Sequence, residues 1–136
     1  RTANRSTIAE GIVAAAREIA ETTQIKSICC FTESGTTALL TARERPRVPI
    51  LAMTSVMRTA RRLALSWGTN CVMTGPKNRF KEAVVSAVRA ALAEGYASAD
   101  DQLVIMAGVP FNVPGTTNIL RVAPCDERQI YSMDPE

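Results

Sequence analysis

The sequence predicts an α/β domain of three layers (α/β/α), with helices on both faces of a mixed five-stranded sheet. Short apolar runs alternate with segments of helical periodicity along most of the 136 residues, and a chain of this length forms about one domain. The last two apolar runs are separated by fewer residues than a crossover helix needs. We therefore expect four parallel strands and a last strand that is antiparallel and lies at an edge.

The first half of the chain supplies two helix–strand units. Apolar residues recur at three- and four-residue spacing over residues 6–23, which predicts a helix with Ser6 as its N-cap. The run over residues 26–32 is continuous and apolar, as expected of a strand covered on both faces. The pattern repeats, with a helix predicted over residues 35–43 and a strand over residues 48–54.

The second half continues the alternation. A third helix is predicted over residues 56–66 and a strand over 70–75, followed by the longest helix, over 78–94, which Gly95 ends. Strands are predicted over residues 102–108 and 117–123. We assign residues 1–125 to a single domain and expect residues 126–136 to form an irregular C-terminal tail.

Composition argues against several classes of protein. The chain is 46% hydrophobic and 21% charged, with a net charge of +3, which is typical of a globular domain. We expect a cytoplasmic location and no membrane association, since no apolar run reaches the roughly 18 residues of a membrane span. The excess charge comes from scattered Arg residues, interpreted as solvated surface, so no nucleic-acid partner is expected.

The cysteines and the absence of histidine limit the catalytic mechanisms that this chain could use. The chain has four Cys and no His, so it holds neither a Cys–His nor a Ser–His catalytic pair. Cys29, Cys30 and Cys71 lie in strand-like runs and are interpreted as small buried apolar residues. An enzyme that uses Cys29 or Cys30 is an alternative with little support, because neither thiol has a base nearby. No catalytic residue, metal site or cofactor is predicted for this chain.

A hydroxyl-rich segment, FTESGTTA, follows the first predicted strand and opens the second helix. Ligands of open α/β sheets bind beyond the carboxyl ends of the strands, and a helix N-terminus there attracts anions. The segment therefore predicts a phosphate site formed by Thr32, Ser34, Gly35, Thr36 and Thr37. The alternative is that Ser34 or Thr32 only caps the helix. The segment lacks the Lys of a P-loop.

A second loop, GVPFNVPGTT, must lie at the same end of the sheet, because it follows the fourth parallel strand. Its Gly and Thr residues are interpreted as a second wall around a bound anion, with Pro residues stiffening the loop. The alternative is a plain reversal of the chain, in which Gly and Pro only form turns. The residues assigned to this effector loop are Gly108, Pro114, Gly115, Thr116 and Thr117.

Four blocks in this order resemble the C-terminal domain of pyruvate kinase: FTESGTTALLTARERPRVPILAMT, RTARRLAL, WG and MAGVPFNVPGTTNILRV. The resemblance spans residues 8–122. It implies a mixed five-stranded sheet with an antiparallel last strand, in agreement with the pattern above. It also implies a regulatory domain with an allosteric site for a phosphorylated sugar, often fructose bisphosphate, between the two loops.

Two departures from the family pattern bear on the ligand. Strongly activated members often have Lys where this chain has Glu33, and Trp where it has Val109. A carboxylate in place of an ammonium group repels a phosphate. For a second phosphate, Arg79 and Lys81 are the candidates. We expect a monophosphate effector, a sugar phosphate or AMP, or no effector response.

The resemblance implies that the parent enzyme of glycolysis transfers phosphate from phosphoenolpyruvate to ADP and is a tetramer. Its catalytic residues, Mg²⁺ and K⁺ belong to a barrel of about 250 residues. This chain is too short to hold one, so we expect it to be inactive alone and to have the barrel and further copies of itself as partners. Its start at Arg1 is expected of a segment of a longer protein. The alternative is a stand-alone phosphosugar-binding domain without kinase activity.

Overall fold

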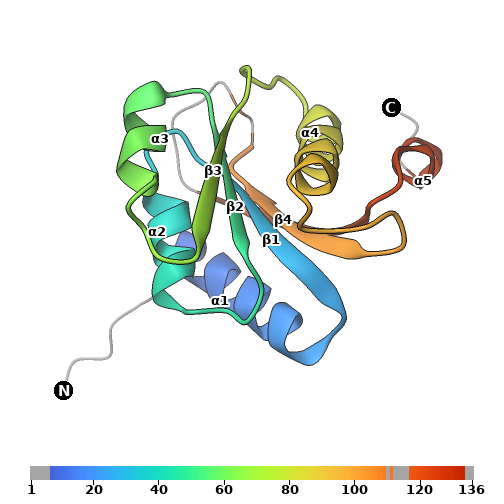
Figure 1. Ribbon diagram of the computed structural model, residues 1–136, viewed down its shortest axis with the longest axis horizontal. Coiled ribbons are helices and arrows are strands. Elements are labelled where there is room, and N and C mark those ends of the chain that lie inside the picture. Colours follow the sequence, from blue (N-terminus) through green and yellow to red (C-terminus); the bar gives the residue numbers. More distant parts are fainter. Residues whose placement is uncertain (1–6, 110, 112–116, 134–136) are drawn as a thin grey trace.

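The sheet has five strands in the order β3-β2-β1-β4-β5, with helices on both faces (Figure 1). The computed structural model describes residues 7–109, 111 and 117–133. The strands are β1 (Ile25–Phe31), β2 (Ile50–Thr54), β3 (Thr69–Met73), β4 (Gln102–Ala107) and β5 (Ile119–Pro124). The helices are α1 (Ile8–Thr22), α2 (Thr36–Arg43), α3 (Met57–Leu63), α4 (Phe80–Ala93) and α5 (Glu127–Met133). The predicted alternation is confirmed, although α1, with 15 residues, is longer than α4, with 14.

Strands β1 to β4 run parallel, and β5 runs antiparallel to β4. In the antiparallel pair Val104 lies opposite Val122, and Ala107 lies opposite Ile119. The few residues between β4 and β5 leave no room for a crossover helix, so the chain must reverse. The mixed sheet with an antiparallel edge strand is confirmed, and β3 forms the other edge.

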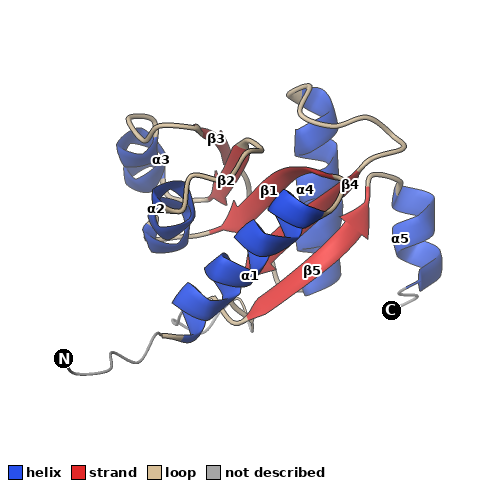
Figure 2. Ribbon diagram, turned by 90° about the horizontal axis from the view of Figure 1, so that it is seen from below, coloured by secondary structure: helices blue, strands red, loops and turns tan. Residues whose placement is uncertain are grey.

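The core is divided between the two faces of the sheet, because successive residues of a strand point to opposite sides. Cys29 and Ile105 pack in the cluster that includes the buried face of α4. Ile28 and Val104, their neighbours in sequence, pack with α1 on the other face. Figures 1 and 2 show α1, α2 and α3 on one side of the sheet and α4 and α5 on the other. The predicted three layers are confirmed.

Helix α1 begins with a reciprocal cap. Thr7 Oγ1 accepts a hydrogen bond from Glu10 N at 3.1 Å, and Glu10 Oε1 accepts one from Thr7 N at 2.8 Å. This capping box needs a Glu or Gln three residues after the cap. Ser6, which lies outside the described residues, has Ala9 at that distance. The prediction of Ser6 as the N-cap is therefore wrong.

A short helix, α5, replaces most of the predicted irregular tail. Ile130 is fully buried in the cluster beneath α4, and Arg89 of α4 donates to Glu127 through Nε at 2.7 Å. Asp126 Oδ1 accepts from Arg128 N at 3.0 Å at the start of the helix. The prediction for residues 126–136 is wrong over Glu127–Met133, because a single apolar anchor gives no periodic pattern.

The central and edge strands differ in how they bury their thiols. Cys29 and Cys30 of β1 have no exposed surface, and burial raises the pKa of Cys30 to about 12. Cys71 lies on the edge strand β3 and is only half-buried, so its predicted full burial is wrong. An edge strand lacks a neighbour on one side, which leaves its side chains less covered.

Candidate functional site

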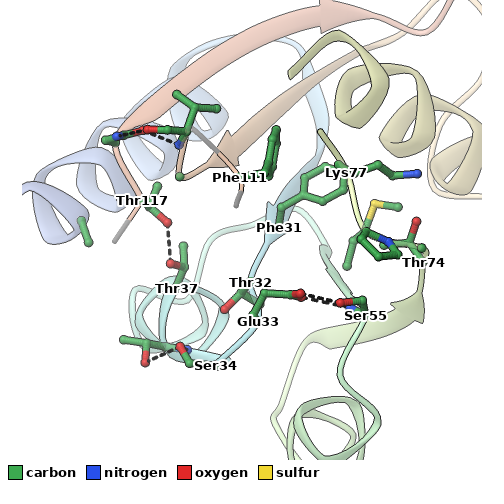
Figure 3. A pocket seen from close by; sticks show the side chains of 18 of the residues that line it. Phe31, Thr32, Glu33, Ser34, Thr37, Ser55, Thr74, Lys77, Phe111 and Thr117 are labelled. Carbon is green, nitrogen blue, oxygen red and sulfur yellow. Dashed lines mark hydrogen bonds between the residues drawn. The ribbon is translucent and has the colours of Figure 1, made fainter. Parts of the chain in front are cut away.

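A cavity of about 650 Å³ opens at the carboxyl ends of the parallel strands. Figure 3 shows its walls, which come from the β1–α2, β2–α3 and β3–α4 connections, the β4–β5 return and the start of α1. This is the end of the sheet where the sequence predicts a ligand site. The lining residues are Ile8, Ala9, Phe31, Thr32, Glu33, Ser34, Thr36, Thr37, Met53, Ser55, Thr74, Gly75, Pro76, Lys77, Gly108, Val109, Phe111, Thr117 and Asn118.

The β1–α2 loop leaves the N-terminus of α2 open to the cavity. The N-cap residue is Gly35, which has no side chain to accept a hydrogen bond from the first turn. Ser34 and Thr36 are exposed; Ser34 Oγ donates to Thr36 Oγ1 at 3.1 Å and accepts from Thr36 N at 3.3 Å. The remaining N–H groups of the first turn and the positive end of the helix dipole can therefore meet an anion.

Thr32 has a structural place in this loop. Its side chain is buried, and its Oγ1 accepts from Gly35 N at 2.8 Å. The Thr32 hydroxyl thus closes the turn that leads into α2, and it does not cap the first turn of the helix. Of the five residues predicted to bind phosphate, Ser34 and Thr36 are the two whose side chains are exposed.

Gly35 is required for the packing of the loop on α3. Its φ of +91° is a left-handed conformation that Gly adopts without strain. A Cβ at this position would lie 2.9 Å from Arg62 Nη2 and 3.3 Å from Thr59 Cγ2. Arg62 also donates to the carbonyl oxygen of Ser34, and Thr59 to that of Glu33. Gly35 therefore packs closely against α3. From the sequence, this close approach is instead predicted to be to a bound ligand.

Glu33 points along the cavity floor to the β2–α3 connection (Figure 3). Its carboxylate accepts from Ser55 N at 3.0 Å, from Thr54 Oγ1 at 3.1 Å and from Ser55 Oγ. Partial burial acts to raise the pKa of this carboxyl group, but the hydrogen bonds from Ser55 and Thr54 outweigh it and hold the pKa below its ordinary value. Glu33 is therefore ionised at neutral pH and keeps a negative charge beside the cavity.

The β4–β5 return meets α2 through two hydroxyl groups. Thr37 Oγ1 and Thr117 Oγ1 are 2.5 Å apart, and both side chains are buried. Asn118 closes the base of the return: its Oδ1 accepts from Val109 N at 2.9 Å, and its Nδ2 donates to Val109 O at 2.8 Å. Gly108 lines the cavity beside them. The predicted effector-loop residues Pro114, Gly115 and Thr116 lie outside the described residues.

The middle of the cavity is apolar, which the sequence motifs do not indicate. The rings of Phe31 and Phe111 form an edge-to-face pair with centroids 6.2 Å apart at 75°. Met53, Pro76 and Val109 also line the cavity. Phe31 is the last residue of a buried strand, and only the pairing of distant segments brings Phe111 to it.

The cation at the cavity is Lys77, not either residue predicted for a second phosphate. Among the described lining residues Lys77 is the one Lys or Arg. Arg79 stands at the start of α4, outside the lining, with its backbone N donating to Glu82 Oε1 at 3.3 Å. Lys81 Nζ lies 5.0 Å from the centroid of the Tyr131 ring. Lys77 lies in the connection after β3, four residues beyond Met73. The rule that ligands bind at strand ends could therefore have indicated it from the sequence.

The part of the chain that the structure describes supports neither a metal site nor a membrane-spanning helix. It contains no group of three or more His, Cys, Asp or Glu side chains that could hold a metal ion. Its helices are too short or too polar for any of them to cross a membrane.

The fold and the cavity define a three-layer α/β domain with a cavity at the carboxyl ends of its parallel strands. The sequence model of the family described as "Pyruvate kinase, alpha/beta domain" matches residues 10–123. The chain belongs to this family.

The relatives that this chain matches are longer proteins. The chain is 38% identical over 117 residues to a pyruvate kinase of Methylorubrum extorquens, covering 86% of this chain and 24% of the relative. It is 40% identical over 111 residues to one of Agrobacterium vitis, covering 82% and 23%. A solved Cryptosporidium parvum pyruvate kinase in complex with ADP matches with a TM-score of 0.81 and 26% identity over 91% of this chain and 25% of that one. The chain thus spans about a quarter of these proteins.

Proposed function

We propose that this chain is the regulatory domain of a pyruvate kinase and that its rim cavity binds a phosphorylated effector. The observation that carries the proposal is the open N-terminus of α2, where the exposed hydroxyls of Ser34 and Thr36 border a cavity of about 650 Å³. Backbone N–H groups and the helix dipole bind phosphate in many α/β proteins. Membership of the pyruvate kinase α/β family supports the same function.

The charges of the cavity favour an effector with one phosphate. The ionised Glu33 carboxylate lies along the floor, and Lys77 is the one cation among the described lining residues. A phosphate at α2 can be compensated by the helix dipole and by N–H donors. A second phosphate near Glu33 would meet repulsion that grows as water is excluded. The proposed effectors are therefore a sugar monophosphate or AMP.

The proposed parent enzyme is a glycolytic pyruvate kinase of the cytoplasm that transfers phosphate from phosphoenolpyruvate to ADP. The relatives are about four times as long as the matched segment, so the catalytic barrel, with its Mg²⁺ and K⁺, is the proposed covalent partner of this domain. The chain alone is expected to be inactive. A coupled assay that detects pyruvate formation by the isolated chain would overturn this division of roles.

A second copy of the chain is proposed to pair with the β5 edge, as part of a tetramer. Strand β5 ends the sheet, and Val122 on it is 38% exposed. Sedimentation of the chain and of Val122→Lys tests this, with Met73→Lys on the opposite edge strand as control, since Met73 is 43% exposed. We expect only the β5 variant to dissociate. Equal behaviour of both variants would contradict the proposed surface.

An NMR titration of the chain tests effector binding, with glucose 6-phosphate, AMP and inorganic phosphate as probes. We expect saturable shifts in the amides of Ser34, Thr36 and Thr37, and in those of Gly108 and Thr117. Shifts confined to other surfaces would overturn the proposal.

A charge variant provides the matched control. Thr36→Asp puts a carboxylate at the first turn of α2, where it repels a phosphate but interacts favourably with the helix dipole. We expect it to abolish binding without lowering the melting temperature. Gln24→Glu adds the same charge at an exposed position before β1, at the opposite end of the sheet, and is expected to leave binding unchanged.

A further inference from the structure

Helix α5 is an element outside the family match. The match ends at residue 123, whereas α5 spans Glu127–Met133. All five strands and helices α1 to α4 precede it in the chain, so the three-layer fold is complete without it. Helix α5 begins shortly after β5 and lies beside α4 (Figures 1 and 2). A role of α5 must therefore be sought in its contacts with α4 and the sheet.

Two contacts join α5 to α4. Arg89 donates to Glu127 through Nε at 2.7 Å and through Nη2 at 2.9 Å, so the pair is bidentate. Lys81 Nζ lies 5.0 Å from the centroid of the Tyr131 ring. Lys81, Val85 and Arg89 are spaced by four residues and so lie along one face of α4. Glu127 and Tyr131 have the same spacing on α5 but meet α4 in reverse order, so the two helices run antiparallel.

A single buried side chain anchors α5 between these contacts. Ile130 is fully buried in the cluster that includes Val85 and Cys125. Among the described side chains of α5 it is the one that is buried, and Tyr131 is 50% exposed. The side chain of Arg89 is 67% exposed, and a surface ion pair adds little stability. A segment with so few buried contacts detaches at a lower free-energy cost than the core unfolds.

The thiol of Cys125 lies in the same cluster as the anchor. Cys125 is 2% exposed and stands two residues before α5 begins. Burial and, to a smaller extent, the Asp101 carboxylate raise the pKa of Cys125 to about 11, so little thiolate is present while α5 is in place. Cys29 and Cys30 lie in the central strand β1 and have no exposed surface. The three thiols can therefore distinguish detachment of α5 from unfolding of the sheet.

We propose that α5 is a strap that holds α4 against the sheet and that it detaches as a unit while the sheet stays folded. A helix of seven residues is unstable in isolation, so α5 loses its helical structure when it detaches. The core cluster on the α1 face contains residues of β1, β2 and β4 and none of the described residues of α5. Detachment leaves that cluster intact and exposes the Cys125 thiol and the face of α4 that carries Val85. This device does not depend on any ligand of the rim cavity.

Two chemically identical substitutions separate detachment of α5 from unfolding of the sheet. Ile130→Val and Ile28→Val each remove one methylene from a fully buried side chain, the first in the strap and the second in the cluster on the α1 face. Hydrogen exchange is measured by NMR at the amide of residue 130, which donates to the Asp126 carbonyl oxygen at 3.1 Å. The slowest amides of β4 report unfolding of the sheet. In the unmodified chain we expect residue 130 to exchange at least tenfold faster than these amides.

The two variants are expected to differ at residue 130. Ile130→Val weakens the attached state alone, so it raises exchange at residue 130 at least threefold. Ile28→Val weakens the attached and the detached state alike. It therefore raises exchange in β4 at least threefold and changes residue 130 less than twofold. An equal rise at residue 130 in both variants, or equal exchange of residue 130 and β4 in the unmodified chain, would show that α5 detaches only when the whole domain unfolds and would overturn the inference.

Alkylation of the native 136-residue chain with iodoacetamide, followed by peptide mass spectrometry, gives a second readout. We expect Cys125 to be labelled at least tenfold faster than Cys29 and Cys30, because its thiol is exposed whenever α5 detaches. Labelling of Cys125 should rise at least threefold in Ile130→Val and less than twofold in Ile28→Val. Labelling of Cys125 at the same rate as Cys29 and Cys30 would contradict a strap that detaches on its own.

Discussion

The two main walls of the cavity are held in different ways. The β1–α2 loop is bound to its neighbours at consecutive residues, since Glu33 contacts the β2–α3 connection and the carbonyl oxygens of Glu33 and Ser34 accept from α3. The β4–β5 return is tied at its base by Asn118 and to α2 by the Thr37–Thr117 pair. The first wall thus depends on backbone fit and the second on a few side chains, and substitutions can separate the two.

The largest effect is expected at Gly35, where backbone and packing act together. Gly35→Ala introduces a Cβ 2.9 Å from Arg62 Nη2 at a φ of +91°. We expect it to lower the free energy of unfolding by about 2–4 kcal/mol, because a left-handed Ala costs about 1–2 kcal/mol and the clash adds to it. Thermal and urea unfolding of both chains measure the change.

Gly68→Ala measures the free-energy cost of the left-handed backbone conformation without a steric clash. Gly68 has a φ of +72°, but a Cβ there meets nothing within 4 Å. We expect this control to cost about 1–2 kcal/mol, the backbone cost of a left-handed Ala alone. If Gly35→Ala and Gly68→Ala lower stability equally, the contact of the β1–α2 loop with α3 is not the reason for Gly35, and this contact does not hold the first wall.

The next effect belongs to the second wall. Thr117→Val removes one hydroxyl with little change of shape and leaves the buried Thr37 hydroxyl without its partner 2.5 Å away. We expect a loss of about 1–2 kcal/mol in unfolding free energy. Thr37→Val should cost a similar amount.

A double-mutant cycle shows whether the pair acts as a unit. Replacing both Thr residues by Val leaves no unpaired hydroxyl, so the double variant is expected to be more stable than the sum of the single losses predicts. Additive losses would mean that each hydroxyl has another partner and that the return is not held to α2 through this pair.

Sequence reasoning gives the fold almost completely, for physical reasons that lie in local pattern. Alternating strand and helix periodicity and the short gap after β4 determine a mixed sheet whose last strand reverses. Two of the errors occur where a single residue decides the outcome: Ile130 is the apolar side chain of α5 that packs in the core, and the partner of the α1 cap is Glu10 and not Ala9.

The site is predictable only in part, because its residues come from segments far apart in the chain. Ser34 and Thr36 follow from the rule that ligands meet strand ends and helix starts. The Phe31–Phe111 contact and the Thr37–Thr117 pair join positions 80 residues apart in sequence, and no local pattern indicates them. The direction of Glu33 toward Ser55 depends on how β1 and β2 lie side by side.

The smallest effect is expected from Glu33→Gln, which tests how much the charge adds to the first wall. The amide keeps the shape but loses acceptor strength toward Ser55 and Thr54, so we expect a loss of about 1 kcal/mol or less at pH 7.

The pKa of Glu33 is below the ordinary value of 4.5 in the folded protein, so the ionised carboxylate stabilises the fold above that pH. This contribution is lost as the pH falls through the folded-state pKa. The unfolding free energies of the chain and of Glu33→Gln should therefore converge as the pH falls below 4.5 and through the lower folded-state pKa of Glu33. Glu18→Gln, which removes a carboxylate on the exposed side of α1, is the control and should change the unfolding free energy at pH 7 by less than Glu33→Gln does. A Glu33→Gln deficit that persists unchanged at low pH would show that the side chain acts through its shape, and that the β1–α2 loop is held by α3 alone.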